Sequence, residues 1–346
     1  MARIRIGRRY IGNQCRPYII AEAGINHNGE IEKAFAMIDL AKSVGADAVK
    51  FQTFKAEEFV GDGKLTYTYK SQDKLVTESM LTMFQRYEFG REDWYKIKKK
   101  CDDVDICFLS TPQNRSDLDL LLALGIPAVK VGSDDLTNLP LLKSYALTKL
   151  PLLISCGMSN MAEIYQALDS IGTLQGYPTI LFVCTSQYPT PPKDSNLLRI
   201  KTLLNIFPKL YLGFSDHTTG SLAATVAVGL GAIAFEKHFT LDNDLPGPDH
   251  WFSANPIQLK NWVDSIRAAN IMLGHGIVEP TKREMINKKE FQRVIVAAKD
   301  IKKGDIFTGE SFVMLRISEG KGFPPMFVDY LLGKTSIRDI KKGEPI

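Results

Sequence analysis

Residues 209–216, KLYLGFSD, and residues 232–239, AIAFEKHF, are the two runs that decide the fold. Each is a short apolar stretch rich in β-forming residues, and each ends in polar residues. Toward the N-terminus, six further runs of the same kind occur. They are PYIIAEAG from Pro17, DAVKFQT from Asp47, ICFLST from Ile106, AVKVGS from Ala128, PLLISCG from Pro151 and TILFVCTS from Thr179. The sequence therefore predicts eight strands of similar character.

Segments with helical spacing separate these runs. EKAFAMIDLAKSVGA, residues 32–46, precedes the second run, and SDLDLLLALG, residues 116–125, precedes the fourth. Strands that alternate with helices form a parallel sheet, and eight such units predict a (β/α)₈ or TIM barrel. The rival topology is a doubly wound open sheet. That fold usually places a glycine-rich phosphate loop after its first strand, and the sequence has no GxGxxG motif.

The composition and the residue pattern change beyond the predicted barrel. SANPIQLKNWVDSIRAANIML, residues 253–273, supplies a last helix, and residues 1–275 are predicted to form the barrel domain. Residues 276–289 are predicted to be a linker because Gly, Pro, Lys and Glu recur in this part of the chain. In residues 290–346 the motif DIKKG occurs twice, which indicates a small β-rich domain. A domain of this size buries little surface, so it is expected to rest on a partner surface.

The composition is that of an ordinary soluble protein, with 346 residues, 45% hydrophobic, 24% charged and a net charge of +4. No long run of Lys or Arg points to nucleic acid as a partner. Five cysteines, an odd number, argue against a disulfide framework and for a reducing compartment. The N-terminal stretch MARIRIGRRYIG predicts a short β-hairpin rather than a signal peptide or a membrane span. A cytoplasmic protein without membrane contact is therefore expected.

Polar residues end each of the eight predicted strands. The carboxyl ends of barrel strands form the active site, whereas the strand interiors hold apolar side chains. The polar ends are Glu22, Lys50 with Gln52, Ser110 with Thr111, Lys130 with Ser133, Ser155, Thr185 with Ser186, Ser215-Asp216-His217 and Glu236-Lys237-His238. Lys50 and Lys130 together with the serines suit an anion that carries both phosphate and carboxylate. The alternative is that the lysines extend from the barrel rim into solvent or pair with nearby acids.

His217 and His238 end the seventh and eighth predicted strands, which are neighbours in a closed barrel. Two imidazoles at adjacent strand ends, with positions left open for oxygen ligands, predict a divalent metal site. The alternative is that each histidine binds no metal and only makes structural contacts. His27 lies in NHNG, a good turn sequence whose side chains can hydrogen-bond locally, and His250 lies in the proline-rich loop LPGPDH.

A set of motifs in order along the chain resembles a known family, the sialic acid synthases (N-acetylneuraminate synthase and its bacterial relatives). The resemblance runs from about Tyr18 to Ser253 and resumes in the tail, which resembles the antifreeze-like (SAF) domain of those enzymes. The motifs are IAEAGINHNGE, AVKFQT, FLSTP, VKVGSDDLTN, LLISCGMS, CTSQYPTP, GFSDHTTG and FEKHFTLDNDLPGPDH. The resemblance implies a TIM barrel, a domain-swapped homodimer, and condensation of phosphoenolpyruvate with N-acetylmannosamine or a related N-acyl amino sugar.

The resemblance also implies roles for individual residues. His217 and His238 match ligands of Mn²⁺ or Mg²⁺, and Glu22 matches an acidic residue near the reacting carbons. The positions that match the surroundings of phosphoenolpyruvate are Lys50, Thr111, Lys130, Ser133, Ser155 and Ser215. Tyr188 and Asp249 match positions that face the sugar, and Arg316 matches a tail arginine that reaches into the partner's site. Asp135 and Ser186 depart from the glutamate and asparagine of some members, which leaves the identity of the sugar open.

Several alternatives to this function remain. A legionaminic acid synthase would use a 2,4-diacetamido-trideoxy hexose in place of N-acetylmannosamine, and GINHNG and GSDDLTN disfavour a pseudaminic acid synthase. A Schiff-base aldolase would use a strand-end lysine as its nucleophile. A non-catalytic protein that binds sugar or ice through its tail would have no need of the lysines and histidines at the barrel mouth.

Overall fold

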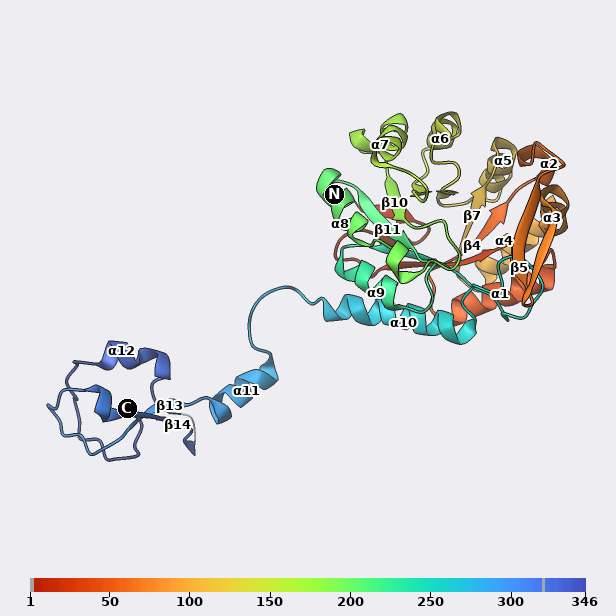
Figure 1. Ribbon diagram of the computed structural model, residues 1–346. Coiled ribbons are helices and arrows are strands. Elements are labelled where there is room, and N and C mark those ends of the chain that lie inside the picture. The colour runs from red at the N-terminus through yellow and green to blue at the C-terminus, as the bar shows by residue number, and fades with distance from the viewer. Residues whose placement is uncertain (1–2, 319–320) are drawn as a thin grey trace. The chain divides into compact units, whose positions relative to one another are not determined.

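The structure is a computed structural model that describes residues 3–318 and 321–346 (Figure 1). The chain forms two compact units, one that ends at Gly274 and one that begins at His275. Each unit has a hydrophobic core of its own. Among the described residues, no helix has the length and the apolar character needed to cross a bilayer.

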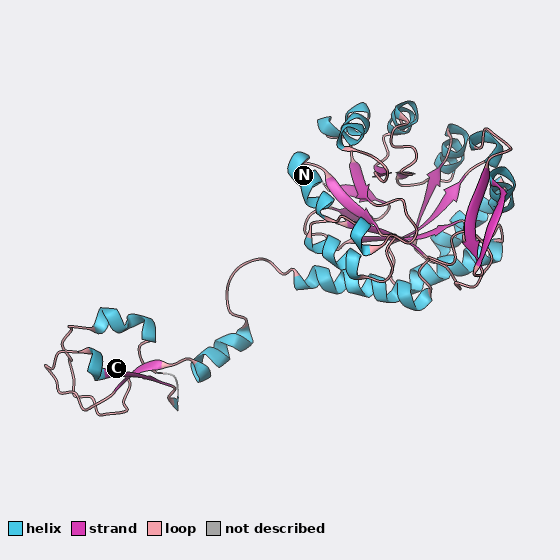
Figure 2. Ribbon diagram, in the orientation of Figure 1, coloured by secondary structure: helices cyan, strands magenta, loops and turns pink. Residues whose placement is uncertain are grey.

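Eight parallel strands form the sheet of the first unit (Figure 2). They are β3 (Tyr18–Gly24), β4 (Ala48–Thr53), β7 (Cys107–Pro112), β8 (Val129–Val131), β9 (Leu152–Ser155), β10 (Thr179–Val183), β11 (Tyr211–Ser215) and β12 (Ala234–His238). They pair in the order β7-β4-β3-β12-β11-β10-β9-β8, and β7 and β8 at the two ends of this order also lie in contact. The sheet is thus a nearly closed barrel with a strand in every predicted run, which confirms the predicted fold.

Helices alternate with these strands and cover the outside of the barrel (Figure 2). They are α1 (Ile31–Ser43), α4 (Arg91–Asp103), α5 (Arg115–Ala123), α6 (Leu139–Ala146), α7 (Met161–Ser170), α8 (Leu198–Ile206), α9 (Leu222–Gly229) and α10 (Pro256–Met272). Local sequence sets several of their starts. At α7, for example, the side chain of Asn160 accepts hydrogen bonds from two backbone N–H groups, and Glu163 bonds back to the N–H of Asn160.

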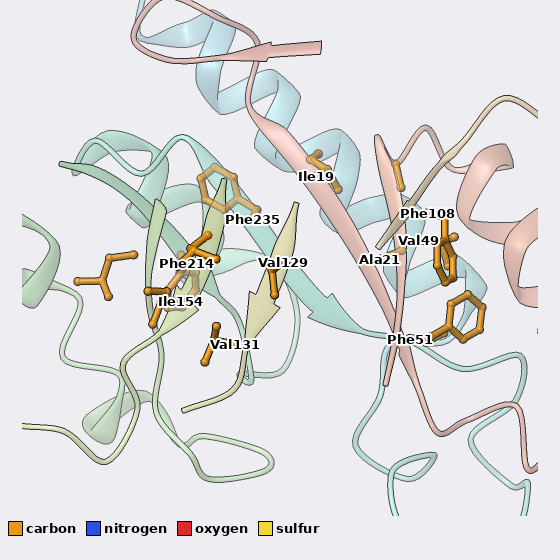
Figure 3. Packing of buried hydrophobic residues seen from close by; sticks show 14 of the residues in the cluster. Ile19, Ala21, Val49, Phe51, Phe108, Val129, Val131, Ile154, Phe214 and Phe235 are labelled. Atoms are coloured by element: carbon orange, nitrogen blue, oxygen red, sulfur yellow. The ribbon is translucent and has the colours of Figure 1, made fainter. Parts of the chain in front are cut away.

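Side chains along each strand alternate between the helices and the barrel interior. On β3, Ile19 and Ala21 pack in the core between sheet and helices (Figure 3), whereas Tyr18 and Ile20 belong to a second core inside the barrel. That interior layer takes residues from every strand. They are Tyr18, Ile20, Ala48, Leu109, Ala128, Leu153, Ile180, Phe182, Tyr211 and Ala234. The next inward position of each strand therefore lies above an apolar layer, toward the carboxyl end.

The N-terminal hairpin closes the other end of the barrel. Strands β1 (Ile4–Ile6) and β2 (Arg9–Ile11) pair antiparallel, as predicted, and their isoleucines belong to the interior core. A glycine in β11 makes room for the ring of Phe182 in the interior layer. A Cβ atom at Gly213 would lie 2.6 Å from the ring of Phe182, so any larger residue would displace that ring.

A second hairpin is inserted between β4 and β7. It consists of β5 (Thr66–Ser71) and β6 (Lys74–Ser79), flanked by the short helices α2 (Ala56–Phe59) and α3 (Met80–Tyr87). Tyr69 of β5 belongs to a small separate core with Ile25, Phe54, Met83 and Tyr87. Since Ile25 directly follows β3, this core attaches the hairpin to the carboxyl end of the barrel.

The second unit is small and contains the repeated motif. Strands β13 (Val294–Ala297) and β14 (Phe312–Leu315) pair antiparallel, and the short helix α12 (Val328–Leu331) contributes to their core. The two DIKKG copies pair with each other, because Ile301 and Ile340 exchange both backbone hydrogen bonds at 2.8 Å. The repeat seen in the sequence is therefore a structural pair.

The segment before β13 is not an extended linker along its whole length. Helix α11 (Lys282–Phe291) lies where the linker over residues 276–289 was predicted. A capping box starts it, with Glu284 N–H donating to the Thr281 hydroxyl at 3.2 Å and Thr281 N–H donating to the Glu284 carboxylate at 2.8 Å. A helix advances about 1.5 Å per residue against about 3.3 Å for extended chain. This segment consequently spans less distance than a linker of the same length.

Candidate active site

The polar side chains above the apolar layer include a buried charge cluster. Oε2 of Glu22 lies 2.8 Å from Nζ of Lys50. Glu236 lies between the two lysines, with carboxylate oxygens 3.9 Å from Nζ of Lys50 and 3.8 Å from Nζ of Lys130. All four side chains are at most 6% exposed. Two positive and two negative charges thus share one buried space, where their interactions are stronger than at a surface.

Neutral side chains hold three of these charges in place. The ammonium of Lys50 donates to the Thr111 hydroxyl at 3.1 Å, and the Gln52 amide donates to Oε1 of Glu22 at 3.2 Å. The ammonium of Lys130 donates to the Ser155 hydroxyl at 2.7 Å. All of these residues lie on barrel strands, and Lys50 and Gln52 share one face of β4. The cluster is therefore positioned by the barrel rather than by flexible loops.

The two carboxylates of the cluster differ in their proton affinity. Burial raises the pKa of Glu22, and Glu236 adds to the effect although Lys50 opposes it. Burial also acts to raise the pKa of Glu236, but Lys130 and Lys50 together bring that pKa below its ordinary value. The difference arises because Glu236 faces both lysines, whereas Glu22 contacts only one. Of the two, Glu22 is the group that can take up and release a proton near neutral pH.

His217 is held in one tautomer. Its Nδ1 lies 2.7 Å from the carbonyl oxygen of Thr185, and a carbonyl can only accept, so Nδ1 carries the proton. Nε2 then has a free lone pair and lies 3.2 Å from the hydroxyl of Ser215, which is also 3.2 Å from Oε1 of Glu236. Burial lowers the pKa of His217 to about 4. The imidazole is therefore neutral at physiological pH.

His238 lies beside His217, with 5.8 Å between the ring centroids. Its Nδ1 is buried and, in the part of the chain that the structure describes, has no hydrogen-bond partner. Oδ2 of Asp249 lies 3.9 Å from this nitrogen. Burial and the neighbouring His217 lower the pKa of His238 well below its ordinary value, while burial raises the pKa of Asp249 to about 7.

Two aromatic side chains, Tyr188 and Phe252, lie beside the two histidines. The ring of Tyr188 lies 4.1 Å from His217 and 5.6 Å from His238 between centroids, and Phe252 lies 5.5 Å from His238. Tyr188 remains 40% exposed. Amphipathic rings beside polar groups suit a ligand that has both hydroxyl groups and an apolar face.

The two histidines could supply some, but not all, of the ligands of a metal ion. Two neutral imidazoles with available lone pairs, one of them an unpartnered buried nitrogen, are a suitable donor set for a divalent transition metal. In residues 3–318 and 321–346, no group of three or more His, Cys, Asp or Glu side chains converges on one point. Any ion held here would therefore take its remaining ligands from water or substrate.

Ser133 and Ser186, two of the predicted serines, lie next to Gly157. The hydroxyl of Ser133 accepts from the N–H of Gly157 at 3.0 Å. A Cβ atom at Gly157 would lie 2.8 Å from that hydroxyl and 2.4 Å from the hydroxyl of Ser186. Glycine is thus required here because two hydroxyl groups occupy the space of a side chain.

Asp135 and Arg316, two of the predicted site residues, make their described side-chain hydrogen bonds to residues outside the charge cluster. Asp135 accepts a hydrogen bond from the side chain of Asn138, at the start of α6, at 3.0 Å. Arg316 lies in the second unit, where its Nε donates to the carbonyl oxygen of Phe291 at 2.8 Å. Its side chain is exposed. A role for either residue in the site remains a prediction.

Sequence reasoning did not select two residues that the barrel brings into the cluster, Gln52 and Glu236. Both stand at polar strand ends, and the two-residue alternation of a strand could have found them. Gln52 is two positions after Lys50, and Glu236 is two positions before His238, so each shares its neighbour's inward face. The intervening Lys237 points the other way and pairs with Asp216 at 3.2 Å.

His27 and His250 have structural contacts instead. Nδ1 of His27 accepts from the N–H of Gly29 at 3.0 Å, and its ring stacks on Phe89 with 4.3 Å between centroids. His250 is hydrogen-bonded through both nitrogens, to Thr240 at 2.7 Å and to Asn28 at 3.0 Å. Burial lowers the pKa of His27 to about 3 and of His250 to about 4. Both rings are therefore neutral, and their contacts are structural.

Comparison with known proteins gives matches over both units. A model of the NeuB family matches residues 37–278, and a model of the SAF domain matches residues 292–346. The N,N'-diacetyllegionaminic acid synthase of Legionella pneumophila is 37% identical over 96% of this chain and 94% of that protein. The N-acetylneuraminate-9-phosphate synthase of Homo sapiens is 33% identical over 98% of this chain and 93% of that protein.

A solved structure agrees with these matches. The crystal structure of the N-acetylneuraminic acid synthetase of Leptospira borgpetersenii, in complex with citrate, aligns with a TM-score of 0.74 at 32% identity. The alignment covers 84% of this chain and 97% of that one. The alignments with the two relatives cover 96% and 98% of this chain, so they include most of the barrel.

Proposed function

The chain belongs to the NeuB family and ends in an SAF domain, and we propose that it joins phosphoenolpyruvate to an N-acyl amino sugar. The products are a nonulosonic acid of the sialic type and inorganic phosphate. One observation carries the proposal. One barrel mouth holds two buried lysines with hydroxyl donors, here called the lysine half, and two neutral histidines beside the ring of Tyr188, here called the histidine half. The Ser215 hydroxyl connects the two, because it lies 3.2 Å from both Glu236 and His217. The lysine half suits a small polyanion, and the histidine half suits a sugar.

Phosphoenolpyruvate fits the lysine half. Lys50 and Lys130 would supply positive charge, and the hydroxyls of Thr111 and Ser155 already contact them at 3.1 and 2.7 Å. Ser133, Ser186 and Ser215 add donors for phosphate and carboxylate oxygens. Because these groups are held in place before substrate arrives, they stabilise the phosphate charge without reorganisation.

The sugar fits the histidine half. His217 and His238 would hold a divalent ion, and imidazole donors favour Mn²⁺ over Mg²⁺ because Mg²⁺ prefers oxygen ligands. When bound, such an ion supplies Lewis acidity that polarises the sugar's open-chain aldehyde. Tyr188 and Asp249, which border the histidines, then contact the sugar chain.

The bond changes follow from the chemistry of an enol ester. Carbon 3 of phosphoenolpyruvate attacks the aldehyde carbon, which leaves positive charge at carbon 2. Water adds at carbon 2, and the resulting tetrahedral intermediate expels phosphate by cleavage of the C–O bond. We assign to Glu22 the proton that this water loses, because Glu22 is the carboxylate whose pKa is raised by burial toward neutrality.

Two sugars are the main candidates. N-acetylmannosamine is the first, and a 2,4-diacetamido-trideoxy hexose is the second. Similarity to the legionaminic acid synthase of Legionella pneumophila supports the second. A Schiff-base aldolase needs a lysine with a neutral amine. Glu22 and Glu236 raise the pKa of Lys50 against the effect of its burial and so keep its amine protonated. Burial lowers the pKa of Lys130, so Lys130 is the lysine that such an aldolase would use.

We also propose that the second unit acts on the barrel of another subunit in a swapped homodimer. Large apolar side chains are exposed on both units. They include Leu222, Ile257, Ile271 and Met272 on the barrel's α9 and α10 and Met326 and Tyr330 on the second unit, each at least 66% exposed. Exposed apolar groups of this size favour association. Arg316, whose planar donor group suits an acyl oxygen, would enter the partner's site.

The test is release of inorganic phosphate from phosphoenolpyruvate in the presence of a panel of N-acyl hexosamines with Mn²⁺. We expect release with N-acetylmannosamine or with the 2,4-diacetamido sugar, and a nonulosonic acid as the coupled product. Turnover that survives EDTA and is abolished by borohydride with substrate would instead identify a Schiff-base aldolase. Without release for any sugar, the proposed function fails.

A further inference from the structure

The hairpin of β5 and β6 is anchored to the loop that carries Asp249. The hydroxyl of Ser71 accepts from the N–H of Gly247 at 3.0 Å, and the amide of Gln72 donates to the carbonyl oxygen of Asp244, also at 3.0 Å. The ammonium of Lys70 lies 5.4 Å from the ring centroid of Trp251. Three consecutive residues of the hairpin thus hold one loop, residues 241–253, which follows β12 and brings Asp249 to His238.

The alternation of β5 decides which of its side chains face the barrel. Tyr67, Tyr69 and Ser71 lie on one face of the strand, because successive side chains point to opposite faces. Tyr69 is buried against the carboxyl end of the barrel, and its hydroxyl donates to Glu78 at 2.5 Å. Ser71 bonds to Gly247. Since both neighbours on its face contact the mouth, Tyr67 projects to the same side.

Tyr67 extends beyond the packed part of this face. Its ring lies 5.8 Å from that of Tyr69, close to parallel, yet it remains 40% exposed. Burial and the carboxylate of Asp249 raise the pKa of its phenol. The hydrogen bond between Ser71 and Gly247 places this face of β5 beside the loop that carries Asp249.

We propose that Tyr67 is a specificity-determining residue that contacts the end of the amino sugar remote from the aldehyde. This inference rests on the proposed function. Asp249 lies 3.9 Å from His238, and the loop that carries Asp249 is bonded to Ser71, which shares a strand face with Tyr67. A sugar whose aldehyde lies at the histidines would therefore extend toward the hairpin. A phenol hydroxyl beside a carboxylate suits hydroxyl or acylamino groups. It does not suit a phosphate, which would meet the charge of Asp249, and Lys70 is engaged with Asp73 at 2.7 Å.

The experiment compares wild type with Tyr67→Ala and Tyr67→Phe. The control is Leu75→Ala, a change on β6 of the same hairpin at a side chain that is 79% exposed. We expect Tyr67→Ala to raise the KM for the sugar about tenfold, with the KM for phosphoenolpyruvate and kcat at saturating sugar within twofold of wild type. Tyr67→Phe should raise the sugar KM by about three- to tenfold, the range for one lost hydrogen bond. Leu75→Ala should match wild type.

A second arm uses sugars that differ only at the remote end. Wild type should turn over a sugar with a free terminal hydroxyl with a kcat/KM at least tenfold above that of its terminal phosphate ester, and Tyr67→Ala should reduce the difference between sugars that differ there in uncharged groups. If the active enzyme and Tyr67→Ala have the same sugar KM, the inference is overturned and the proposed function stands. Should Tyr67→Ala fail to fold, Tyr67→Phe decides, and a sugar KM equal to wild type overturns the contact. A wild type without turnover on any sugar overturns both.

Discussion

The ammonium of Lys50 lies 2.8 Å from the carboxylate of Glu22, and both side chains are almost completely buried. The positive charge that should attract phosphoenolpyruvate is therefore already balanced inside the protein. A polyanion that enters competes with Glu22 for Lys50, and its own charge favours protonation of Glu22. The pair thus couples substrate binding to the protonation state of the group that we assign to the water.

Glu22→Gln tests this coupling. We expect kcat to fall by about 100-fold or more, because positioned general acids and bases contribute about 10² to 10⁴. The affinity for phosphoenolpyruvate should be unchanged or higher, since a negative charge beside Lys50 is lost. Steady-state kinetics and equilibrium binding measure the two quantities separately. A kcat within twofold of wild type would remove Glu22 from the mechanism.

The histidine pair predicts a dependence on metal. His217→Ala and His238→Ala should each reduce turnover below detection at ordinary Mn²⁺ concentration and weaken Mn²⁺ binding in calorimetric titrations, with the thermal unfolding of the barrel retained. His275→Ala is the control, because His275 is exposed and lies outside the barrel unit. Full activity in either strand-end variant, or in exhaustively chelated wild type, contradicts the prediction.

The proposed bond cleavage predicts the fate of one oxygen atom. With phosphoenolpyruvate that carries oxygen-18 in the bridging C–O–P position, the label should leave in inorganic phosphate, because the C–O bond breaks. Mass spectrometry of the phosphate and of the sugar acid measures the distribution. Retention of the label in the sugar acid would mean that the P–O bond breaks and that the mechanism is wrong.

The swapped dimer predicts complementation between two inactive variants. Arg316→Ala has an intact barrel, and His217→Ala has an intact second unit, so a mixed dimer contains one complete site. Mixing the two with subunit exchange should restore part of the activity, up to about a quarter of wild type if exchange is random. Mixing His217→Ala with His238→Ala should restore none, because both changes lie in the barrel. If exchange occurs and the first mixture stays inactive, Arg316 does not act across subunits.

A buried histidine predicts a pH dependence of stability. The pKa of His27 is lowered by burial to about 3, against about 6.5 in an unfolded chain. Between these values the unfolded chain binds a proton that the folded protein does not, so the free energy of unfolding falls as the pH falls from about 6.5. His27 contributes up to about 1.4 kcal/mol per pH unit to the slope. His217 and His250 add to it, because burial lowers their pKa values as well. His27→Gln should reduce the slope by the share of His27, whereas His275→Gln, at an exposed position, should leave it unchanged.

Urea titrations between pH 7 and pH 4.5 measure this slope. Tryptophan fluorescence reports the barrel alone, because Trp94, Trp251 and Trp262 all lie before Gly274. Parallel stability curves for wild type and His27→Gln would show that His27 is protonated in the folded protein and that its packing against Phe89 is looser than the structure indicates.

Much of the barrel could be predicted from local pattern. The alternation of apolar and polar residues within each run is a property of a strand, and the change to polar residues at its end needs no knowledge of neighbouring strands. Lys50, Lys130, His217 and His238 were found in this way, although the roles predicted for them are still untested. The pairing of the two DIKKG copies likewise begins from a repeat that is visible in the sequence.

Helix α11 shows a limit of local signals. Gly and Pro before Thr281 favour a linker, but a capping box and the run of helix-forming residues after it favour a helix, and the helix forms. The hairpin at β5 and β6 shows another. Its strands can be recognised locally, whereas its attachment to the loop that carries Asp249 depends on contacts between residues more than 170 positions apart.

The sequence by itself determined the eight strands, their order of apolar and polar positions, and hence which residues end at the barrel mouth. The tertiary structure alone decided that Glu236 lies between Lys50 and Lys130 and that Asp135 bonds to Asn138 instead of to the cluster. The physical reason is that strand patterns arise from the backbone's two-residue period, which is local. Distances across the barrel, and the burial that shifts the pKa of Glu22 and His217, arise only when distant strands close around one space.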